Sequence, residues 1–581
     1  MASVFSALDK FTPSQIGENG HSEYTWSNGL REKIIQLSFQ LTRTTQEEQI
    51  DRLSQMANDI LTQLTRDNKA SQISKEEYIE FMSIMFRLVG HTRDLVDGKG
   101  EYTLSYMLLS VWYQHHPKLA QFAFRCFVFN NGIIGSNEGH PYGSWKDVKY
   151  MIRYMEERGT GEKLVDFAIY LINLQLKDDV SSDTPSLAAK WVPREKSKFS
   201  DLFVRLAENY FSEYFSTAKT DHSRVKARTK SKMDYRKIIS ALNKKLDTVQ
   251  VKQCANTWSD IDPSKQTSVT MHKQKNAFLN KTQKGDIRST LEDRIQCAKT
   301  FEEYATKAAK GEVEIKGKRI GMNDFTKDAL KLIDYNNMES SEAQILNAQW
   351  LNNSLQTGKL GKMVAMVDVS GSMDGDPMYA AIALGIRIAE KSLLGKRVLT
   401  FSATPSWVNL DGCDDFISMV SAVKRADWGM NTNFAAALNL ILDAIIQHKL
   451  QPEDVEDMVL TILSDMQIDQ ADYKYGSMME MIEKKYAEAG MRLWNKPFKA
   501  PHILFWNLRS TNGFPCLSTQ KNASMMSGFN PSLLNLFCEE GLNALQSCTP
   551  WSLLMKSLAS DRYNILDLML RVELDERVYK N

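Results

Sequence analysis

The spacing of apolar residues changes near residue 360, and this change restricts the possible folds strongly. Between about residues 28 and 358, apolar residues recur at intervals of three and four, as in 50–64 and 199–215, which is typical of amphipathic helices. Later, short apolar runs of strand length such as 362–369 and 502–507 alternate with helical patterns, which predicts a mostly parallel sheet. We therefore expect a multidomain chain, in which an all-α N-terminal domain precedes a doubly wound, Rossmann-like α/β domain.

The length of 581 residues favours two or three domains. Polar residues at 352–361 mark the main boundary. We expect an N-terminal extension at 1–27, a helical domain at 28–358 and an α/β domain at 359–581. About a dozen helices joined by short connections favour a HEAT-like or irregular helical arrangement, although the sequence has no clean repeat period.

Composition and targeting features indicate an intracellular protein. The seven cysteines lie far apart and form no C-x-x-C pair, so neither a zinc cluster nor a disulfide framework is expected. The first residues lack the basic and apolar regions of a signal peptide, and no apolar run has the length of a membrane span. The net charge of +1 favours neither a nucleic acid nor a membrane as partner of the chain as a whole. We expect a cytoplasmic protein, or a virion protein if the source is a virus.

A group of oxygen-bearing side chains follows the apolar run at 362–367. Asp368, Ser370 and Ser372 are spaced by two residues, with a glycine between the serines. In open α/β sheets, ligands bind beyond the carboxyl ends of the strands, so these three side chains can point to one place. Thr432 opens a later helix and Asp465 ends another apolar run, which returns both to the same edge. Such oxygen donors suit Mg²⁺ (or Mn²⁺), while capping of a helix by Asp368 and the serines is the simpler alternative.

This pattern resembles the metal-ion-dependent adhesion site (MIDAS) of von Willebrand factor A (vWA) domains. The threonine follows Asp368 by 64 residues, and Asp465 follows the threonine by 33. The resemblance implies that Asp368, Ser370, Ser372 and Thr432 coordinate the ion directly or through water. Asp465 would act mainly through water, and an acidic side chain of a protein partner would fill the open sixth position. One departure is the loop before Thr432, where Met430 and Asn431 replace a glycine that is common in relatives.

Motifs outside the α/β part extend the resemblance to an uncharacterised family with a helical domain and a vWA domain. The family occurs in plants, fungi, protists and large DNA viruses, and the quoted motifs are 92–101, 142–147, 190–196, 464–467 and 505–509. Its architecture is similar to that of the Ro autoantigen, which combines a TROVE domain with a vWA domain. That similarity implies an RNA-binding helical domain.

The segment 219–245 is strongly basic, with ten Lys or Arg residues against two Asp residues. Such a block attracts phosphate backbones, and the aromatic residues Tyr235 and Trp258 could stack on bases. A solvated helix face is the alternative reading. Arg93, Lys99 and Lys146 could add an inner basic surface, although packing salt bridges would look identical in sequence. The candidate RNA-binding residues are Arg224, Lys226, Arg228, Lys230, Lys232, Arg236 and Lys237.

Together these features predict a non-enzymatic, Ro-like binding protein. Its helical domain would bind structured or single-stranded RNA, and its vWA domain would bind a partner through the metal. One alternative is a protein–protein scaffold or virion assembly component without nucleic acid. Another is a metal-dependent hydrolase, which needs a general base near Asp368. Asp374 and Asp376 are the nearest acids in sequence, and solvated loop positions explain them better.

Overall fold

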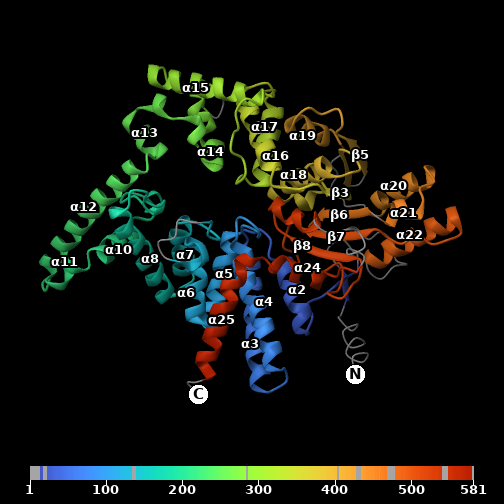
Figure 1. The fold of residues 1–581 in the computed structure, drawn as a ribbon, viewed down its shortest axis with the longest axis horizontal. Coiled ribbons are helices and arrows are strands. Elements are labelled where there is room, and N and C mark those ends of the chain that lie inside the picture. The colour runs from blue at the N-terminus through green and yellow to red at the C-terminus, as the bar shows by residue number, and fades with distance from the viewer. Residues whose placement is uncertain are drawn as a thin grey trace. The chain divides into compact units, whose positions relative to one another are not determined.

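Two compact units make up the chain, and each is assembled from segments far apart in sequence (Figure 1). The computed structural model describes residues 14–16, 22–133, 139–282, 285–401, 405–426, 434–456, 458–467, 478–538 and 547–578. The α/β unit contains Met1–Ile73, Pro263–Asp286 and Lys299–Ser560. The helical unit contains Ser74–Asp262, Ile287–Ala298 and Asp561–Asn581. The predicted order, a helical region followed by a region with a β-sheet, is confirmed.

The helical unit consists of helices that pack largely in chain order. Helices α4, α5 and α6 pack on one another, α7 packs on α8, and α10 packs on both α8 and α12. No helix in the described part of the chain is both long and apolar enough to cross a membrane. The main helices of this unit are α4 (Lys75–Arg93), α5 (Tyr102–His115), α6 (Pro117–Val128), α7 (Lys146–Glu157), α8 (Glu162–Ser181), α9 (Ala188–Trp191), α10 (Ser200–Tyr210), α11 (Glu213–Ser216), α12 (Asp221–Lys245), α13 (Val249–Ala255) and α25 (Asn564–Val578).

The C-terminal helix α25 belongs to this helical unit and packs on α4 and α6. Arg562, just before α25, donates two hydrogen bonds of 2.7 and 2.8 Å to the fully buried carboxylate of Asp94. Tyr563 adds a third through its hydroxyl group, at 3.2 Å. Bidentate pairs of this kind are among the stronger polar contacts in proteins, so they fix the start of α25 beside the end of α4.

A second ion pair, which is buried, shows whether Arg93 lines a basic surface or forms a packing salt bridge. Its guanidinium donates two hydrogen bonds, of 2.8 and 2.7 Å, to the carboxylate of Asp147. Tyr106 donates a further hydrogen bond of 2.5 Å to the same carboxylate, and all three side chains are buried. Arg93 therefore forms a packing salt bridge rather than part of a basic surface. Lys99 is also buried.

A six-stranded mixed sheet forms the centre of the α/β unit. The strand order is β5-β4-β3-β6-β7-β8, in which β5 is antiparallel to β4 and every other pair is parallel. The order therefore reverses between β3 and β6, and such switch points are where doubly wound sheets bind ligands. The prediction of a mostly parallel sheet is confirmed. The strands are β3 (Lys362–Asp368), β4 (Arg397–Phe401), β5 (Ser406–Asn409), β6 (Met458–Ser464), β7 (His502–Asn507) and β8 (Ala523–Ser527).

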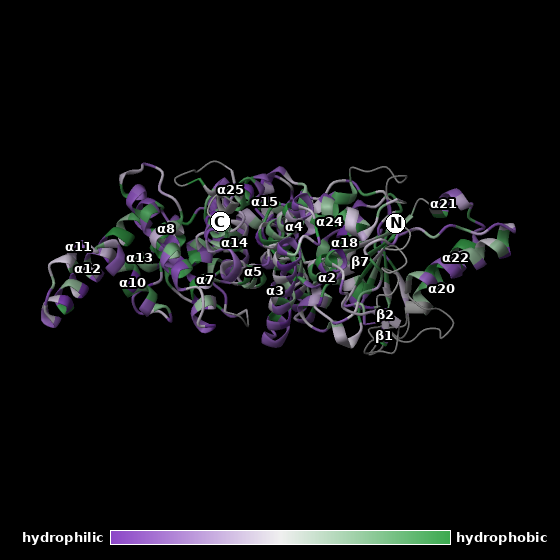
Figure 2. Cartoon of the chain, turned by 90° about the horizontal axis from the view of Figure 1, so that it is seen from below, coloured by the Kyte–Doolittle hydropathy of each residue, from purple (hydrophilic) through white to green (hydrophobic). Residues whose placement is uncertain are grey.

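Helices cover the sheet so that its central strands are buried on both faces. Every residue of β7 is buried, as is every residue of β3 after Lys362. Figure 2 shows the hydrophobic colour on the strands around β7. Parallel strands with both faces covered read as continuous apolar runs, which is why the sequence identified them. The helices of this unit are α14 (Ser268–Phe278), α16 (Met322–Asp334), α17 (Ser341–Ser354), α18 (Asp376–Lys391), α19 (Phe416–Lys424), α20 (Phe434–Gln447), α21 (Pro452–Glu456), α22 (Met478–Trp494) and α24 (Pro550–Leu558), and α15 (Glu292–Ala309) has its first turns in the helical unit.

The N-terminal helices α2 (Leu30–Gln40) and α3 (Glu47–Lys69) also belong to the α/β unit. Helix α2 packs against β8 and α24. Asn507 donates a side-chain hydrogen bond of 3.0 Å to the carbonyl of Phe39, and Ser527 donates one of 3.0 Å to the carbonyl of Ser38. A hairpin of β1 (Ser14–Ile16) and β2 (Ser22–Tyr24) precedes α2. The compact units thus divide the chain differently from the boundaries expected at residues 28 and 359, which stay predictions.

Candidate functional site

Asp368 is the last residue of β3 and its side chain is fully buried. Both carboxylate oxygens accept hydrogen bonds. The backbone N–H of Ser370 donates to Oδ1 at 2.9 Å, and the hydroxyl of Ser464 donates to Oδ2 at 2.6 Å. Since a buried carboxylate is costly without such partners, these two bonds hold its orientation at the edge of the sheet.

Ser370 and Ser372 lie on the turn between β3 and α18. Their hydroxyl oxygens are 3.2 Å apart, so the two candidate ligands stand side by side, directly after Asp368. Ser370 is buried and Ser372 is partly exposed. The turn therefore presents two hydroxyl groups next to a carboxylate, with the second hydroxyl nearer to solvent.

Asp465 follows β6, the parallel neighbour of β3. Val367 of β3 pairs with Leu463 of β6. Asp368 and Asp465 come shortly after these two residues, so both lie at the same edge of the sheet. Asp465 is fully buried, and its Oδ1 accepts a hydrogen bond of 3.1 Å from the backbone of Gln467. Its Oδ2 lies 3.6 Å from Nη1 of Arg509.

The electrostatics of the edge reflect two neighbouring buried carboxylates. Burial, and after it the negative charge of Asp465, raises the pKa of Asp368 to about 7, although hydrogen bonds from Ser370 and Ser464 act in the opposite direction. Like charges in a shared dry site disfavour ionisation of both groups. Positive charge at this edge therefore lowers the energy of the ionised pair, and Arg509 supplies one such charge.

These donors fit a small, hard divalent cation. Two carboxylates and two hydroxyl groups form an all-oxygen set, which Mg²⁺ prefers and which leaves positions for water. Within the described residues, three or more His, Cys, Asp or Glu side chains nowhere gather as a metal site, so a site here depends on hydroxyl ligands. Thr432, the remaining predicted ligand, lies outside the described residues.

Two residues of this edge escaped the sequence analysis as parts of the site. The hydroxyl of Ser464 donates a hydrogen bond to Asp368, and Arg509, in the loop after β7, forms an ion pair with Asp465. Both stand in motifs quoted for the family resemblance, but neither is identified by spacing alone. Their roles depend on the register of β6 and β7 against β3, which only the folded sheet defines.

A hollow of about 460 Å³ lies along α12 in the helical unit, and a second of about 500 Å³ borders the carboxyl edge of the sheet in the α/β unit. The second hollow is next to this edge because Gln467, one of its lining residues, also contacts Asp465. Its lining comprises Gln15, Ile16, Glu23, Thr25, Trp26, Gln467 and Asn512. The N-terminal hairpin therefore lies close to the carboxyl edge of the sheet, where Asp465 is buried.

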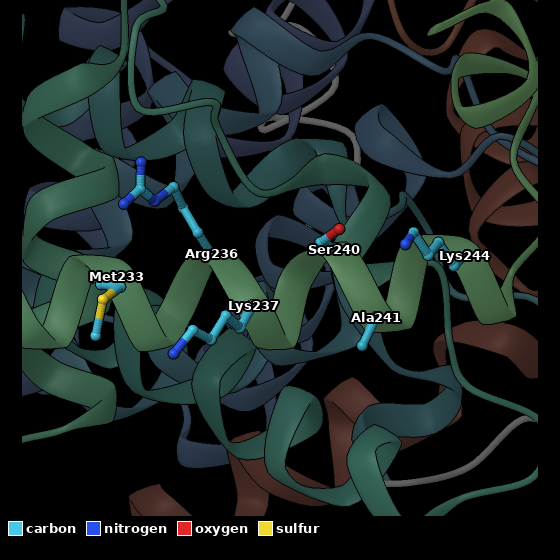
Figure 3. A pocket seen from close by; sticks show the side chains of 6 residues that line it. All are labelled: Met233, Arg236, Lys237, Ser240, Ala241 and Lys244. Carbon is cyan, nitrogen blue, oxygen red and sulfur yellow. The ribbon is translucent and has the colours of Figure 1, made fainter. Parts of the chain in front are cut away.

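The candidate RNA-binding residues all lie on α12, a helix of 25 residues. Its buried side is narrow and consists of Ala227, Ser231, Tyr235 and Leu242. Six of the seven candidates are exposed and Lys232 is partly exposed. Arg236 and Lys237 line the first hollow together with Lys244, and Figure 3 shows these side chains along the helix.

Ion pairs within the helical unit engage four of the seven candidates. Lys232 and Arg236 both pair with Glu195, at 3.3 and 3.1 Å. Arg228 pairs with Glu208, and Lys237 pairs with Asp234 at 3.2 Å. The other three, Arg224, Lys226 and Lys230, form no ion pair with the residues that the structure describes. The attraction for phosphate should therefore be uneven along the helix.

The idea that Tyr235 stacks on bases is wrong. Its side chain is fully buried, and its hydroxyl donates a hydrogen bond of 3.0 Å to the side chain of Asn173. Phe203 and Tyr210 pack against its ring edge to face. Tyr235 therefore anchors α12 to the helical unit. Trp258 is only partly exposed, and the guanidinium of Arg294 lies 3.6 Å from its ring centre.

Comparisons with known proteins give similarities in both parts of the chain. Residues 171–355 match a domain of unknown function (DUF2828), and residues 362–554 match a second domain of unknown function (DUF7788). An uncharacterized protein of Acanthamoeba polyphaga mimivirus (L728) is 27% identical over 526 residues, which cover 86% of this chain and 84% of the viral protein. The chain is thus similar to uncharacterised proteins, with a relative in a large DNA virus, over most of its length.

Proposed function

We propose that the α/β region is a vWA-like domain that binds Mg²⁺ (or Mn²⁺) at the carboxyl edge of its sheet. Asp368, Ser370, Ser372, Thr432 and Asp465 are the proposed ligands. The observation that carries the proposal is the pair of buried carboxylates, Asp368 and Asp465, which follow adjacent strands at the point where the strand order reverses. Two hydroxyl groups beside Asp368 complete an oxygen-rich site.

The role of the metal in this proposal is recognition rather than catalysis. With Asp368, Ser370, Ser372 and Thr432 as ligands and Asp465 acting mainly through water, a six-coordinate ion keeps one position for a further ligand. An Asp or Glu side chain of a partner protein fills this position, so partner binding requires the ion and is lost with a chelator. The metal-dependent hydrolase alternative has no general base assigned, because Asp374 is exposed and Asp376 is partly exposed.

Calorimetric titration of the full chain with Mn²⁺ and Mg²⁺ tests the metal site. Wild-type protein should bind one ion, and Asp368→Ala should abolish this binding because it removes a central ligand. Asp374→Ala is the matched control, since this exposed aspartate lies on the same turn and should leave binding intact. Wild-type protein without a binding isotherm, or unchanged binding by folded Asp368→Ala protein, would contradict the proposal.

We further propose that the helical region binds RNA through α12, in the manner suggested by the Ro-like architecture. The support is an exposed basic face that runs along most of a helix of 25 residues, about 37 Å at 1.5 Å per residue. Cations in such a row exchange places with the counterions of a phosphate backbone, so binding should weaken steeply with salt.

The uneven ion pairing of α12 gives this proposal a matched test. Alanine at three unpaired positions should lower the salt slope for a labelled single-stranded RNA by about 2, since each lost phosphate contact removes about 0.7. Alanine at three paired positions should change the slope less. The unpaired set is Arg224, Lys226 and Lys230, and the paired set is Arg228, Lys232 and Lys237. Fluorescence anisotropy that shows no RNA binding, or equal effects of both sets, would refute the role of α12.

A protein–protein scaffold without nucleic acid is a second candidate function. Ion pairs within the helical unit engage four of the seven basic candidates and favour this function. The charges of these four side chains are already balanced by acidic residues of the protein, so no nucleic acid is needed to explain them. The absorbance ratio at 260 and 280 nm of the purified protein separates the two functions, since co-purified RNA raises it. We propose that the protein is cytoplasmic, or a virion protein if its source is a virus.

A further inference from the structure

Arg509 spans the candidate metal edge from one side to the other. Its Nη1 donates a hydrogen bond of 2.6 Å to the carbonyl oxygen of Ser372 and lies 3.6 Å from Oδ2 of Asp465. These two partners belong to the two separate stretches that supply the proposed ligands. The side chain is 37% exposed, whereas that of Asp465 is fully buried. One side of the guanidinium therefore faces the buried carboxylate, and another reaches solvent at the rim of the site.

The backbone around Arg509 is held firmly in this position. Its N–H donates a hydrogen bond of 3.1 Å to the side chain of Asn507, and Leu508 continues the pairing with β6 through a bond of 3.1 Å to the carbonyl of Ser464. Thr511 donates its hydroxyl to the carbonyl of Asp465 at 3.2 Å. The loop that carries Arg509 is thus tied on both sides to the stretch 464–465, so the guanidinium is directed to the metal edge by the fold.

We propose that Arg509 is a specificity-determining residue of the metal site, which selects an anionic ligand and in return weakens the binding of the ion itself. The inference rests on the proposed metal-dependent function. A carboxylate of the partner that coordinates the ion also accepts hydrogen bonds from the exposed side of the guanidinium, whose planar fork of donors matches a carboxylate. Water at the same position gains much less from a positive neighbour.

The proposal predicts opposite effects on the ion and on the anion. Loss of the charge in Arg509→Met should tighten Mn²⁺ binding about tenfold. The guanidinium lies 3.6 Å from Oδ2 of the proposed ligand Asp465, so it repels a divalent ion there even in a water-like dielectric. The same variant should weaken binding of acetate to the Mn²⁺-loaded protein about tenfold, since a charge-assisted hydrogen bond is lost. A merely structural arginine would loosen the loop and weaken both.

Calorimetry with Mn²⁺ alone, followed by acetate titration monitored through water-proton relaxation by the bound Mn²⁺, measures both effects on the full chain. Arg509→Lys keeps the charge but not the fork, so its Mn²⁺ affinity should stay near wild type while its acetate affinity falls. Arg397→Met is the control for the loss of an exposed positive charge. Arg397 is the first residue of β4, so it lies at the amino end of the parallel strands, away from the proposed metal site.

The outcomes distinguish this inference from the metal site itself. Tighter Mn²⁺ binding together with weaker acetate binding in Arg509→Met supports the role of Arg509. Unchanged or weaker Mn²⁺ binding in folded Arg509→Met protein, or unchanged acetate binding, overturns that role and leaves the metal site standing. Wild-type protein that binds no Mn²⁺ overturns the metal site, and the role of Arg509 with it.

Discussion

Replacement of Ser464 by alanine should weaken metal binding although Ser464 is not a proposed ligand. Its hydroxyl donates a hydrogen bond of 2.6 Å to Asp368 and accepts one of 3.0 Å from the backbone of Met466. The first bond orients a ligand, and the second shapes the turn around Asp465, where Met466 has a positive φ of 64°. A single substitution thus affects both sides of the site.

The expected size follows from what such bonds contribute. A hydrogen bond to a charged acceptor contributes about 1.5–3 kcal/mol, and the loss of a residue that orients a metal ligand typically costs about 10- to 100-fold in affinity. The energy and the affinity ranges agree, because a tenfold change in affinity corresponds to about 1.4 kcal/mol and a 100-fold change to about 2.8 kcal/mol. We expect the Mn²⁺ dissociation constant of Ser464→Ala to rise by a factor in this range, as measured by calorimetry.

Ser527→Ala is the matched control for this measurement. Ser527 also ends a strand and is buried, but its hydroxyl bonds to the carbonyl of Ser38 rather than to a ligand. Its replacement should reduce stability without changing the affinity for Mn²⁺. Equal affinity losses in both variants, or no loss in Ser464→Ala, would refute the reasoning.

Three further predictions concern other parts of the molecule. Tyr235→Phe should cost the helical unit about 1–3 kcal/mol of unfolding free energy, because the buried side-chain oxygen of Asn173 loses its donor; RNA affinity should not change, and a large loss would contradict the buried placement of the ring. Burial and the nearby Lys99 lower the pKa of His91 to about 3, so between the ordinary value of about 6.5 and about pH 3 the unfolded chain binds more protons and the contribution of His91 to stability falls with falling pH; His91→Phe should lose less stability over this window in denaturant titrations, and an equal loss would be evidence against a neutral, buried His91. Thr432→Ala should weaken Mn²⁺ binding in calorimetry, as expected for a ligand, and unchanged affinity would remove Thr432 from the site.

The sheet and the position of Asp368 and Asp465 at its carboxyl edge were predictable because their features are local. Strands β3, β6 and β7 are buried on both faces and appear as continuous apolar runs, and Asp368 and Asp465 come directly after or at the ends of such runs. Because the carboxyl ends of parallel strands lie at the same edge of a sheet, recognising the strands is enough to place these residues there. Strand β8 (Ala523–Ser527) was missed, since its five residues contain two serines and no β-branched residue.

The composition of the two units was not predictable, since it depends on contacts between distant parts of the chain. Helix α2 has a helical pattern in sequence like the helices that follow it, and nothing local shows that Asn507 and Ser527 bond to its backbone. In the same way, the structural role of Arg562 depends on its hydrogen bonds to Asp94, which lies 468 residues earlier in the chain. Tyr235 stands among basic residues in sequence, yet the helical period turns it inward.

A crystal structure of the protein grown with saturating Mn²⁺, with anomalous diffraction data collected at the manganese edge, tests the central claim most directly. The account predicts one strong anomalous peak at the edge of the sheet, within bonding or water-bridged distance of Asp368, Ser370, Ser372 and Asp465. Ordered density for these side chains without a peak among them, or with the Arg509 guanidinium in the place of the ion, would contradict it.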